Sequence, residues 1–267
     1  ASTARVMATP DLGLLSSGFT FSVISNAGAG GNPSLRPFLA DQADLSAEWY
    51  FAPNSILSGA VFYKKVNSFT INRVVETPAP AGYTNPNNAP LPLQITRPVN
   101  GTDGKIYGFE ANYQHALTFL PSPLDGFGYQ LSYTRAESSS PNSLGTGTQP
   151  LPNLSKNSYS GILYYDKGRL EGRLAYTYRD GFLISETIPT RDAAGVITGN
   201  AAGNTYSGKI DTLDGSLAFS ITPKIKLTLD VQNILRGRMR IYQGNSDRIY
   251  SLTVDDRRWF LGASMVF

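Results

Sequence analysis

Apolar and polar residues alternate along most of this chain with the period of two that is typical of β-strands. The clearest example is 224–232, whose apolar face would carry Ile225, Leu227, Leu229 and Val231. The last nine residues, WFLGASMVF, repeat the pattern and place on one face Trp259, Leu261, Ala263, Met265 and Phe267. Each such stretch predicts a strand with one apolar and one polar face.

The pattern predicts an all-β chain of about ten strands and no helix. The expected strands are 2–8, 44–51, 55–69, 105–117, 127–134, 155–165, 169–179, 211–221, 224–232 and 259–267. Short turns are expected near residues 52, 119, 166 and 222, and long polar loops at 10–37, 70–103, 137–152 and 184–207. Short and long connections alternate, which predicts a meander with the short turns at one end and the long loops at the other.

Two architectures fit this alternation. In a soluble β-sandwich the apolar face forms the core, whereas in an outer-membrane β-barrel it meets lipid and the polar face lines the lumen. Loop asymmetry favours the barrel, and so do charges in the middle of the polar faces. Aromatic residues also fall near predicted strand ends, as in the interfacial girdles of barrels: Trp49, Phe51, Phe119, Phe127, Tyr165, Phe219 and Trp259.

Composition excludes several classes of site. The 267 residues contain no cysteine and one histidine, His115, so disulfides, cysteine-bound metals and histidine clusters are excluded. The net charge of +3 gives no reason to expect nucleic acid as a partner. We expect no cofactor and no metal. No apolar run reaches the roughly 18 residues of a transmembrane helix, and no signal peptide is visible, so either a leader was removed or the chain is a piece of a longer one.

Several stretches resemble the barrel of TonB-dependent outer-membrane receptors. They are GNPSLRP (31–37), DLSAEWYF (44–51), FYKKVNSF (62–69), IYGFEANYQ (106–114), LPNLSKNSYSGILYYDKGRLEGRLAYTYRDGFL (151–183), LTLDVQNIL (227–235) and the terminal Phe267. The resemblance covers nearly the whole chain, and its spacing is similar to the receptor branch common in Caulobacter- and Xanthomonas-like bacteria.

The resemblance implies an antiparallel transmembrane barrel of about 22 strands, closed around a plug, in the outer membrane of a Gram-negative bacterium. Residues 1–267 would be a C-terminal part of that barrel, without the plug domain. The implied partners are the lipid bilayer, the plug and remaining strands, TonB through the absent N-terminal part, the barrel-assembly machinery and a small-molecule ligand. The alternative is that ten strands close as a small barrel.

By this resemblance the parent receptor imports a scarce nutrient, with carbohydrates ranked slightly ahead of siderophore-like ligands. Lumen-facing candidates on the substrate path are Glu48, Glu110, Arg173, Arg179, Asp214, Lys224, Lys226 and Asp230. The alternative interpretation is that each of these residues is a hydrated charge on the lumen wall and does not contact the ligand. The loops 70–103 and 184–207 offer a capture surface with Tyr83, Arg97 and Arg191. The terminal face from Trp259 to Phe267 resembles an assembly signal, although it would also simply complete the sheet.

A passive porin is the nearest alternative function, and an outer-membrane hydrolase is a more distant one. A serine hydrolase would have to use His115, and no GxSxG motif frames a serine. No spacing singles out a pair of carboxylates for glycosidase chemistry. The sequence therefore predicts a transport protein and not an enzyme.

Overall fold

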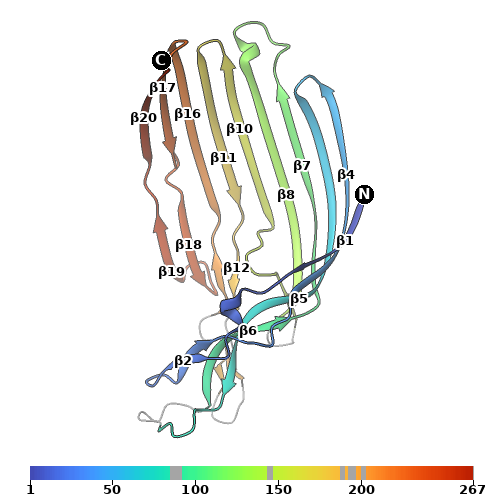
Figure 1. Cartoon of the computed structure of the whole chain (residues 1–267), viewed down its shortest axis with the longest axis vertical. Coiled ribbons are helices and arrows are strands. Elements are labelled where there is room, and N and C mark those ends of the chain that lie inside the picture. Colours follow the sequence, from blue (N-terminus) through green and yellow to red (C-terminus); the bar gives the residue numbers. More distant parts are fainter. Residues whose placement is uncertain (85–91, 143–146, 187–189, 192–196, 200–202, 267) are drawn as a thin grey trace.

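The computed structural model describes residues 1–84, 92–142, 147–186, 190–191, 197–199 and 203–266 (Figure 1). A curved sheet of long strands dominates it. Its long strands are β1 (Ser2–Ala8), β4 (Phe38–Ala52), β5 (Ser55–Thr77), β7 (Gly104–Ala116), β8 (Phe127–Pro141), β10 (Asn157–Lys167), β11 (Leu170–Arg179), β16 (Ile210–Thr222), β17 (Ile225–Gln232) and β20 (Arg258–Met265). Each of the ten expected strands lies on one of these elements.

The pairing registers place the apolar residues of neighbouring strands side by side. Leu217 on β16 lies opposite Gly172 on β11 and Leu229 on β17, and Leu229 lies opposite Leu261 on β20. Because side chains alternate along each strand, this register gives the whole sheet one apolar and one polar face.

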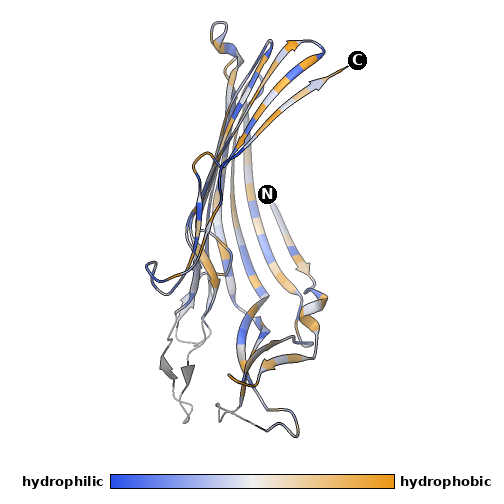
Figure 2. Ribbon diagram, turned by 90° about the vertical axis from the view of Figure 1, so that its left-hand side faces the viewer, coloured by the Kyte–Doolittle hydropathy of each residue, from blue (hydrophilic) through white to orange (hydrophobic). Residues whose placement is uncertain are grey.

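The apolar face has no covering layer in the described part of the chain. Leu131 is 50% exposed, Leu217 is 47% exposed and Leu261 is 85% exposed. Figure 2 shows the long strands from the side as a single curved layer. A sandwich would bury these leucines between two stacked sheets, so the sandwich interpretation is wrong for this structure.

Short turns lie at one end of the long strands, which we call the short-turn end, as predicted (Figure 1). Asn54 and Gly168 adopt positive φ angles of 52° and 64° in the β4–β5 and β10–β11 turns. The β7–β8 connection contains the short 3₁₀ helix η2 (Leu124–Gly126), and Pro223 and Lys224 form the β16–β17 turn. The opposite end carries the long connecting segments.

The curved sheet is open along two edges. At one edge β1 pairs with β4, and at the other β20 pairs with β17; no described pairing joins β1 to β20. The ten long strands therefore do not close on themselves as a small barrel.

The expectation that 10–37 and 70–103 are loops is wrong. These segments contain η1 (Leu12–Leu15), β2 (Phe19–Ser22), β3 (Ala27–Gly30), the outer part of β5, and β6 (Leu93–Gly101). They form one small sheet in the order β2-β3-β6-β5, in which β3 pairs with β6 in parallel. The prolines of this segment favoured a loop, but Pro98 lies opposite Asn72 in the β5–β6 ladder. The N–H of Gln94, four residues earlier, donates to Asn26 on the β3 side, so alternation points the missing N–H of Pro98 to that side, beyond the last β3–β6 pair at Thr96.

The other long connections also contain strands that the sequence pattern did not predict. These are β9 (Thr148–Gln149), β12 (Phe182–Ser185), β13 (Thr190–Arg191), β14 (Ile197–Gly199), β15 (Thr205–Ser207), β18 (Arg238–Gln243) and β19 (Ile249–Val254). The strands β12, β15, β18 and β19 pair in that order as a second sheet beyond the long one. Among the described residues, no helix is long and apolar enough to cross a membrane.

Candidate functional site

Three of the predicted polar-face residues come together at a hollow near the β20 edge. The registers place Arg173 opposite Ser216, Ser216 opposite Asp230, and Asp230 opposite Phe260, so one row crosses β11, β16, β17 and β20. Asp214 lies two residues along β16 from Ser216, on the same face. These residues line a hollow of about 540 Å³, which we call the polar hollow.

The polar hollow offers charge of both signs. Asp214 Oδ1 accepts a hydrogen bond of 2.8 Å from the backbone N–H of Asn233, so one carboxylate oxygen is used by the fold. No ion pair joins Arg173 to Asp230 in the described part of the chain. One guanidinium and two carboxylates can therefore donate to and accept from a polar ligand.

Lys226 forms an ion pair with Glu171, a residue that was not among the predicted candidates. Its Nζ lies 2.7 Å and 2.8 Å from the two carboxylate oxygens of Glu171. Glu171 lies opposite Ala218 on β16, and Lys226 lies opposite Ser220, so two small residues separate the charged side chains. The alternation marks Glu171 as polar-facing, but only the register of three strands brings it to Lys226.

Two other predicted candidates lie on the polar face of different strands. Glu48 is on β4 near the short-turn end, and its carboxylate accepts a hydrogen bond of 2.6 Å from the Tyr50 hydroxyl. Glu110 is exposed on β7, opposite Ala60 and Thr134. Neither of them lines the polar hollow.

Arg179 and Lys224 lie at the two ends of the sheet. Arg179 is the last residue of β11, where its Nε donates to Ser155 Oγ at 3.0 Å and its guanidinium lies 4.3 Å from the Phe182 ring centroid. These contacts fasten a connecting segment to the strand. Lys224 was predicted within a strand, but it lies in the β16–β17 turn, because Pro223 ends the pairing of β16.

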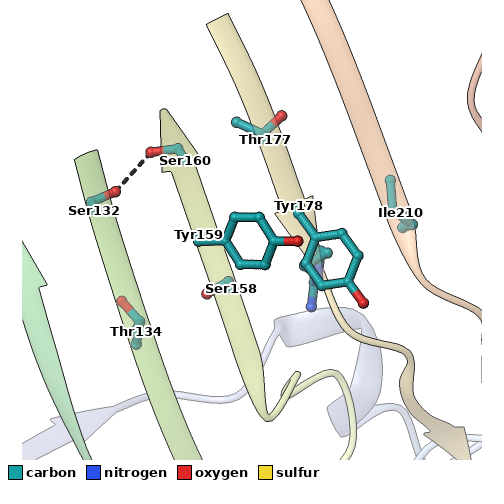
Figure 3. Close-up of a pocket in the computed structure, with 9 residues that line it drawn as sticks. Ser132, Thr134, Ser158, Tyr159, Ser160, Thr177, Tyr178 and Ile210 are labelled. Carbon is teal, nitrogen blue, oxygen red and sulfur yellow. Dashed lines mark hydrogen bonds between the residues drawn. The ribbon is translucent and has the colours of Figure 1, made fainter. Parts of the chain in front are cut away.

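A patch of hydroxyl groups covers the polar face of β8, β10, β11 and β16. Ser132 and Ser160 are hydrogen-bonded at 2.7 Å, and Thr177 and Thr212 at 2.6 Å. Figure 3 shows Ser132 and Ser160 with Ser158, Thr134 and Thr177 nearby. The hydroxyl groups themselves are uncharged and can exchange hydrogen bonds with water or with a polar ligand, and Arg179 adds a cation at the edge of the patch, opposite Ser158.

Tyr83 and Arg97 meet in an aromatic cluster in the small sheet beyond the long strands. The Tyr83 hydroxyl donates to Asn26 Oδ1 at 2.6 Å, and its ring packs edge-on against Phe21 at 5.3 Å. Arg97 lies 5.1 Å from the centroid of Phe19, which neighbours Phe21 at 6.1 Å. Two segments about sixty residues apart in sequence thus build one cluster.

Arg73 adds a second guanidinium beside Arg97. The two residues lie directly opposite each other on β5 and β6, and the buried Nε of each has no hydrogen-bond partner among the described residues. Like charges in this position repel each other. The sequence pattern did not mark Arg73, because the prolines and asparagines of 70–103 predicted a loop there. Of the remaining candidate, Arg191, only the backbone in β13 is described.

The described contacts of His115 are with aromatic side chains and include no serine. Its ring lies within an aromatic group at the short-turn end, 5.1 Å from Phe51 and 5.6 Å from Phe119. Its Nδ1 is 3.1 Å from the Tyr113 hydroxyl. No three potential metal ligands among histidine, cysteine, aspartate and glutamate come together within the described ranges.

The residues proposed as an assembly signal lie on the apolar face of β20. Trp259, Leu261, Ala263 and Met265 are paired, respectively, with Val231, Leu229, Leu227 and Ile225. Phe267 lies outside the described residues. The shared face is therefore present, and recognition by an assembly partner stays a prediction.

Comparison with known families identifies this arrangement. Residues 1–234 match the family described as TonB dependent receptor-like, beta-barrel. The chain belongs to this family. The match shows the family and not a branch within it. A search of curated proteins finds no match to the chain.

Solved structures of TonB-dependent receptors share the fold. The chain is 15% identical to a mutant of the ferric enterobactin receptor PfeA from Pseudomonas aeruginosa in complex with enterobactin, with a TM-score of 0.63 over 98% of this chain and 37% of that one. The ferric-catecholate import receptor Fiu from E. coli is 14% identical to the chain, with a TM-score of 0.58 over 99% of this chain and 32% of that one. The copper transporter OprC is 14% identical to the chain, with a TM-score of 0.59 over 99% of this chain and 35% of that one. The chain thus spans about a third of the length of these relatives.

Proposed function

We propose that this chain is the C-terminal part of an outer-membrane receptor barrel that takes up a scarce nutrient with energy delivered through TonB. The observation that carries the proposal is the uncovered two-faced sheet. Its apolar face suits lipid, its polar face suits a wet lumen, and its short turns and long segments lie at opposite ends.

The open edges support the role of a fragment. Lipid does not tolerate unpaired strand edges, so β1 and β20 need further strands to close the barrel. The proposed partners are the remaining barrel strands and the plug of the parent receptor, TonB, the barrel-assembly machinery and the bilayer.

The polar hollow and the hydroxyl patch are the proposed wall of the substrate path. Their hydroxyl groups, with Arg173, Asp214 and Asp230, favour a ligand rich in hydroxyl groups, such as an oligosaccharide. The second candidate is an anionic iron chelate, and the observation that favours it is the pair formed by Arg73 and Arg97 on the extracellular side.

Uptake by the protein expressed from its full coding sequence in a Gram-negative host tests the proposal. Labelled oligosaccharides and ferric chelates would be supplied separately, with and without TonB. We expect accumulation of one class only, and its loss when TonB is removed. Accumulation that persists without TonB would show a passive porin instead.

Variants test the substrate path separately. Arg173→Ala combined with Asp230→Ala removes both signs of charge from the polar hollow, and we expect slower uptake. Arg5→Ala combined with Asp41→Ala is the matched control, because this ion pair also carries one charge of each sign but lies on the face of Leu45, away from the polar hollow. Equal uptake by both variants would remove the polar hollow from the path and leave the receptor assignment intact.

A further inference from the structure

One row of the polar face carries an aromatic ring at each end. Tyr164 on β10 lies opposite Arg173 on β11. From Arg173 the row continues through Ser216 and Asp230 to Phe260 on β20. We call these five residues the aromatic row. It crosses four strand spacings, which is about 19 Å of the lumen wall.

Phe260 presents its ring to the polar hollow. It is 50% exposed and lines the hollow, although its neighbours Trp259 and Leu261 face the apolar side. The other lining residues lie on β11, β16 and β17, so the hollow lies on the β17 side of the ring, away from the open edge of β20. A phenyl ring gains free energy when an apolar surface covers it, so Phe260 offers a platform for the apolar face of a ligand.

Tyr164 offers a second ring, which leans across β8. Gly128 lies opposite Tyr164, and a Cβ atom at this glycine would lie 2.2 Å from both Cζ and Oη of the tyrosine. Glycine therefore admits the ring at this position. Since β8 and β11 lie on opposite sides of β10, the ring leans away from Arg173 and leaves its guanidinium uncovered.

The polar groups between the two rings have no partners. Arg173 and Asp230 lie on either side of Ser216, and neither forms an ion pair or a side-chain hydrogen bond with any described residue. A guanidinium can only donate hydrogen bonds and a carboxylate can only accept them. A ligand hydroxyl does both, so one kind of ligand group satisfies both side chains.

The charge of this region argues against an anionic chelate. Asp214 and Asp230 line the hollow with Arg173, so carboxylates outnumber the cation. The nearby Lys226 is already paired with Glu171. An anion would be repelled by the excess carboxylate, whereas a neutral sugar has no charge to repel. A sugar ring also combines an apolar face of C–H groups with hydroxyl groups at its edge, which matches an aromatic ring beside polar side chains.

The hydroxyl patch lies on the same strands, farther from the short-turn end. Ser160 is four residues from Tyr164 on β10, and Thr177 is four residues from Arg173 on β11 (Figure 3). Each separation is about 14 Å of strand on the same face. Groups that exchange hydrogen bonds with sugar hydroxyls therefore lead along the wall to the aromatic row.

We propose that the aromatic row binds a neutral oligosaccharide, with one sugar ring stacked on Phe260 and another on Tyr164. The inference rests on the proposed function and names the ligand class of the polar hollow. Asp230 accepts hydrogen bonds from the sugar on Phe260, and Arg173 donates to hydroxyl groups between the two rings. A monosaccharide can cover only one ring, so it binds more weakly than a chain that reaches both.

Calorimetric titration of the full receptor in detergent tests the ligand class. The probes are linear neutral hexasaccharides of glucose, mannose and xylose, the corresponding monosaccharides, and a ferric tris-catecholate. We expect one hexasaccharide to bind, and its monosaccharide to bind at least about tenfold more weakly. Binding of no hexasaccharide would overturn the proposal, and so would equal affinity for the hexasaccharide and its monosaccharide.

Two substitutions of Phe260 test stacking. Phe260→Tyr keeps the flat ring, whereas Phe260→Leu keeps an apolar side chain without it. We expect the tyrosine variant to bind the hexasaccharide as the unmodified receptor does and the leucine variant to bind about tenfold more weakly, because stacking needs an aromatic face. If Phe260→Leu binds normally, the ring only packs against an apolar neighbour, such as a side chain of the plug, and the proposal is refuted.

Asp230→Asn tests the hydrogen bonds of the row. It preserves the size of the side chain but removes the charge that strengthens a hydrogen bond from a sugar hydroxyl. We expect about tenfold weaker binding of the hexasaccharide. Unchanged affinity would remove Asp230 from the site and contradict the proposed arrangement.

Phe62→Leu is the matched control. Phe62 stands on the same polar face, opposite Gly108 on β7, but lies outside the aromatic row. We expect this variant to bind the hexasaccharide normally. An equal loss in Phe62→Leu and Phe260→Leu would show a general effect of removing lumen rings and refute the aromatic row. Heat-modifiable migration on a gel reports that each variant is folded.

Uptake separates failure of this inference from failure of the proposed function. A receptor that imports a ferric chelate with TonB but binds no hexasaccharide refutes the aromatic row alone. Uptake that persists without TonB refutes the proposed function.

Discussion

Lys226 Nζ on β17 lies 2.7 Å from Glu171 Oε1 on β11, and the two side chains meet across the intervening strand β16. The contact joins three strands on the polar face. The side chains remain 37% and 50% exposed, so water screens the charges. A contact of this kind fixes side-chain positions more than it stabilises the sheet.

A double-mutant cycle measures this contact. For Glu171→Gln, Lys226→Gln and the combined variant we expect a coupling free energy of about 0.5 kcal/mol, because exposed ion pairs contribute little. The measurement is urea unfolding of the full protein in lipid vesicles at low and high salt. A coupling above about 2 kcal/mol would indicate a desolvated pair and contradict the exposed geometry.

The lipid-facing assignment predicts a dependence on depth. Leu217 lies in the middle of β16 and Leu170 begins β11, and the two leucines are 47% and 38% exposed. We expect Leu217→Arg to lower the free energy of unfolding by about 2–4 kcal/mol and Leu170→Arg by about 0–1 kcal/mol. Unfolding in vesicles reports both values.

Ser216→Arg is the control for that experiment, since Ser216 is adjacent to Leu217 but lies on the polar face beside Asp230. We expect it to be close to neutral. If the two leucines belonged to the core of a soluble protein, Leu217→Arg and Leu170→Arg would lower the unfolding free energy by similar amounts, because the exposed fractions of the two side chains are similar. Equal losses in those two variants would therefore contradict the lipid face.

Asp125 in η2 predicts a pH dependence at the short-turn end. A hydrogen bond from Lys167 holds the pKa of the Asp125 carboxyl below its usual value. A lowered pKa contributes stability above the ordinary pKa of about 4, and this contribution is lost as the pH falls through the lowered value. Lys167→Ala should therefore be less stable than the unmodified protein near neutral pH.

The measurement is the difference in unfolding free energy between the two proteins as a function of pH. It should be constant from about pH 8 to pH 5 and shrink below about pH 4 as the carboxyl becomes protonated. Lys167→Arg keeps a cationic donor. Like the unmodified protein, it should therefore have a higher unfolding free energy than Lys167→Ala near neutral pH. If the difference in unfolding free energy between the unmodified protein and Lys167→Ala grows as the pH falls, the predicted role of this ion pair is contradicted.

Asn233 fixes the bend where β17 ends. It adopts a positive φ of 53°, its N–H donates to Asp214, its Nδ2 donates to the Asp255 carbonyl at 2.9 Å, and its Oδ1 accepts from the Gly237 N–H at 2.8 Å. We expect Asn233→Ala to lower the unfolding free energy by about 3 kcal/mol, from two lost hydrogen bonds and backbone strain.

Asn233→Gly separates those two causes. Glycine adopts a positive φ without strain. The decrease in unfolding free energy for Asn233→Gly should therefore be about 1 kcal/mol smaller than for Asn233→Ala. Both values come from the same vesicle unfolding experiment. Equal losses would show that the hydrogen bonds of the side chain, and not the backbone conformation, account for the effect.

The sequence by itself determined the long strands, their two faces and the ends at which they turn. Ile225, Leu227, Leu229 and Val231 alternate with polar residues, and a period of two fixes which side chains share a face before any partner strand is known. The same local pattern also marked Arg173, Asp214 and Asp230 as polar-facing.

Only the tertiary structure decided which of those residues meet. The register sets Arg173 in a row with Asp230 and brings Glu171 to Lys226, and register depends on pairing between strands distant in the sequence. The segments around Tyr83 and Arg97 were assigned to loops because proline and asparagine signal turns locally, whereas their strands form only when two long connections pair with each other. Local chemistry specifies a face; pairing across the sheet specifies a site.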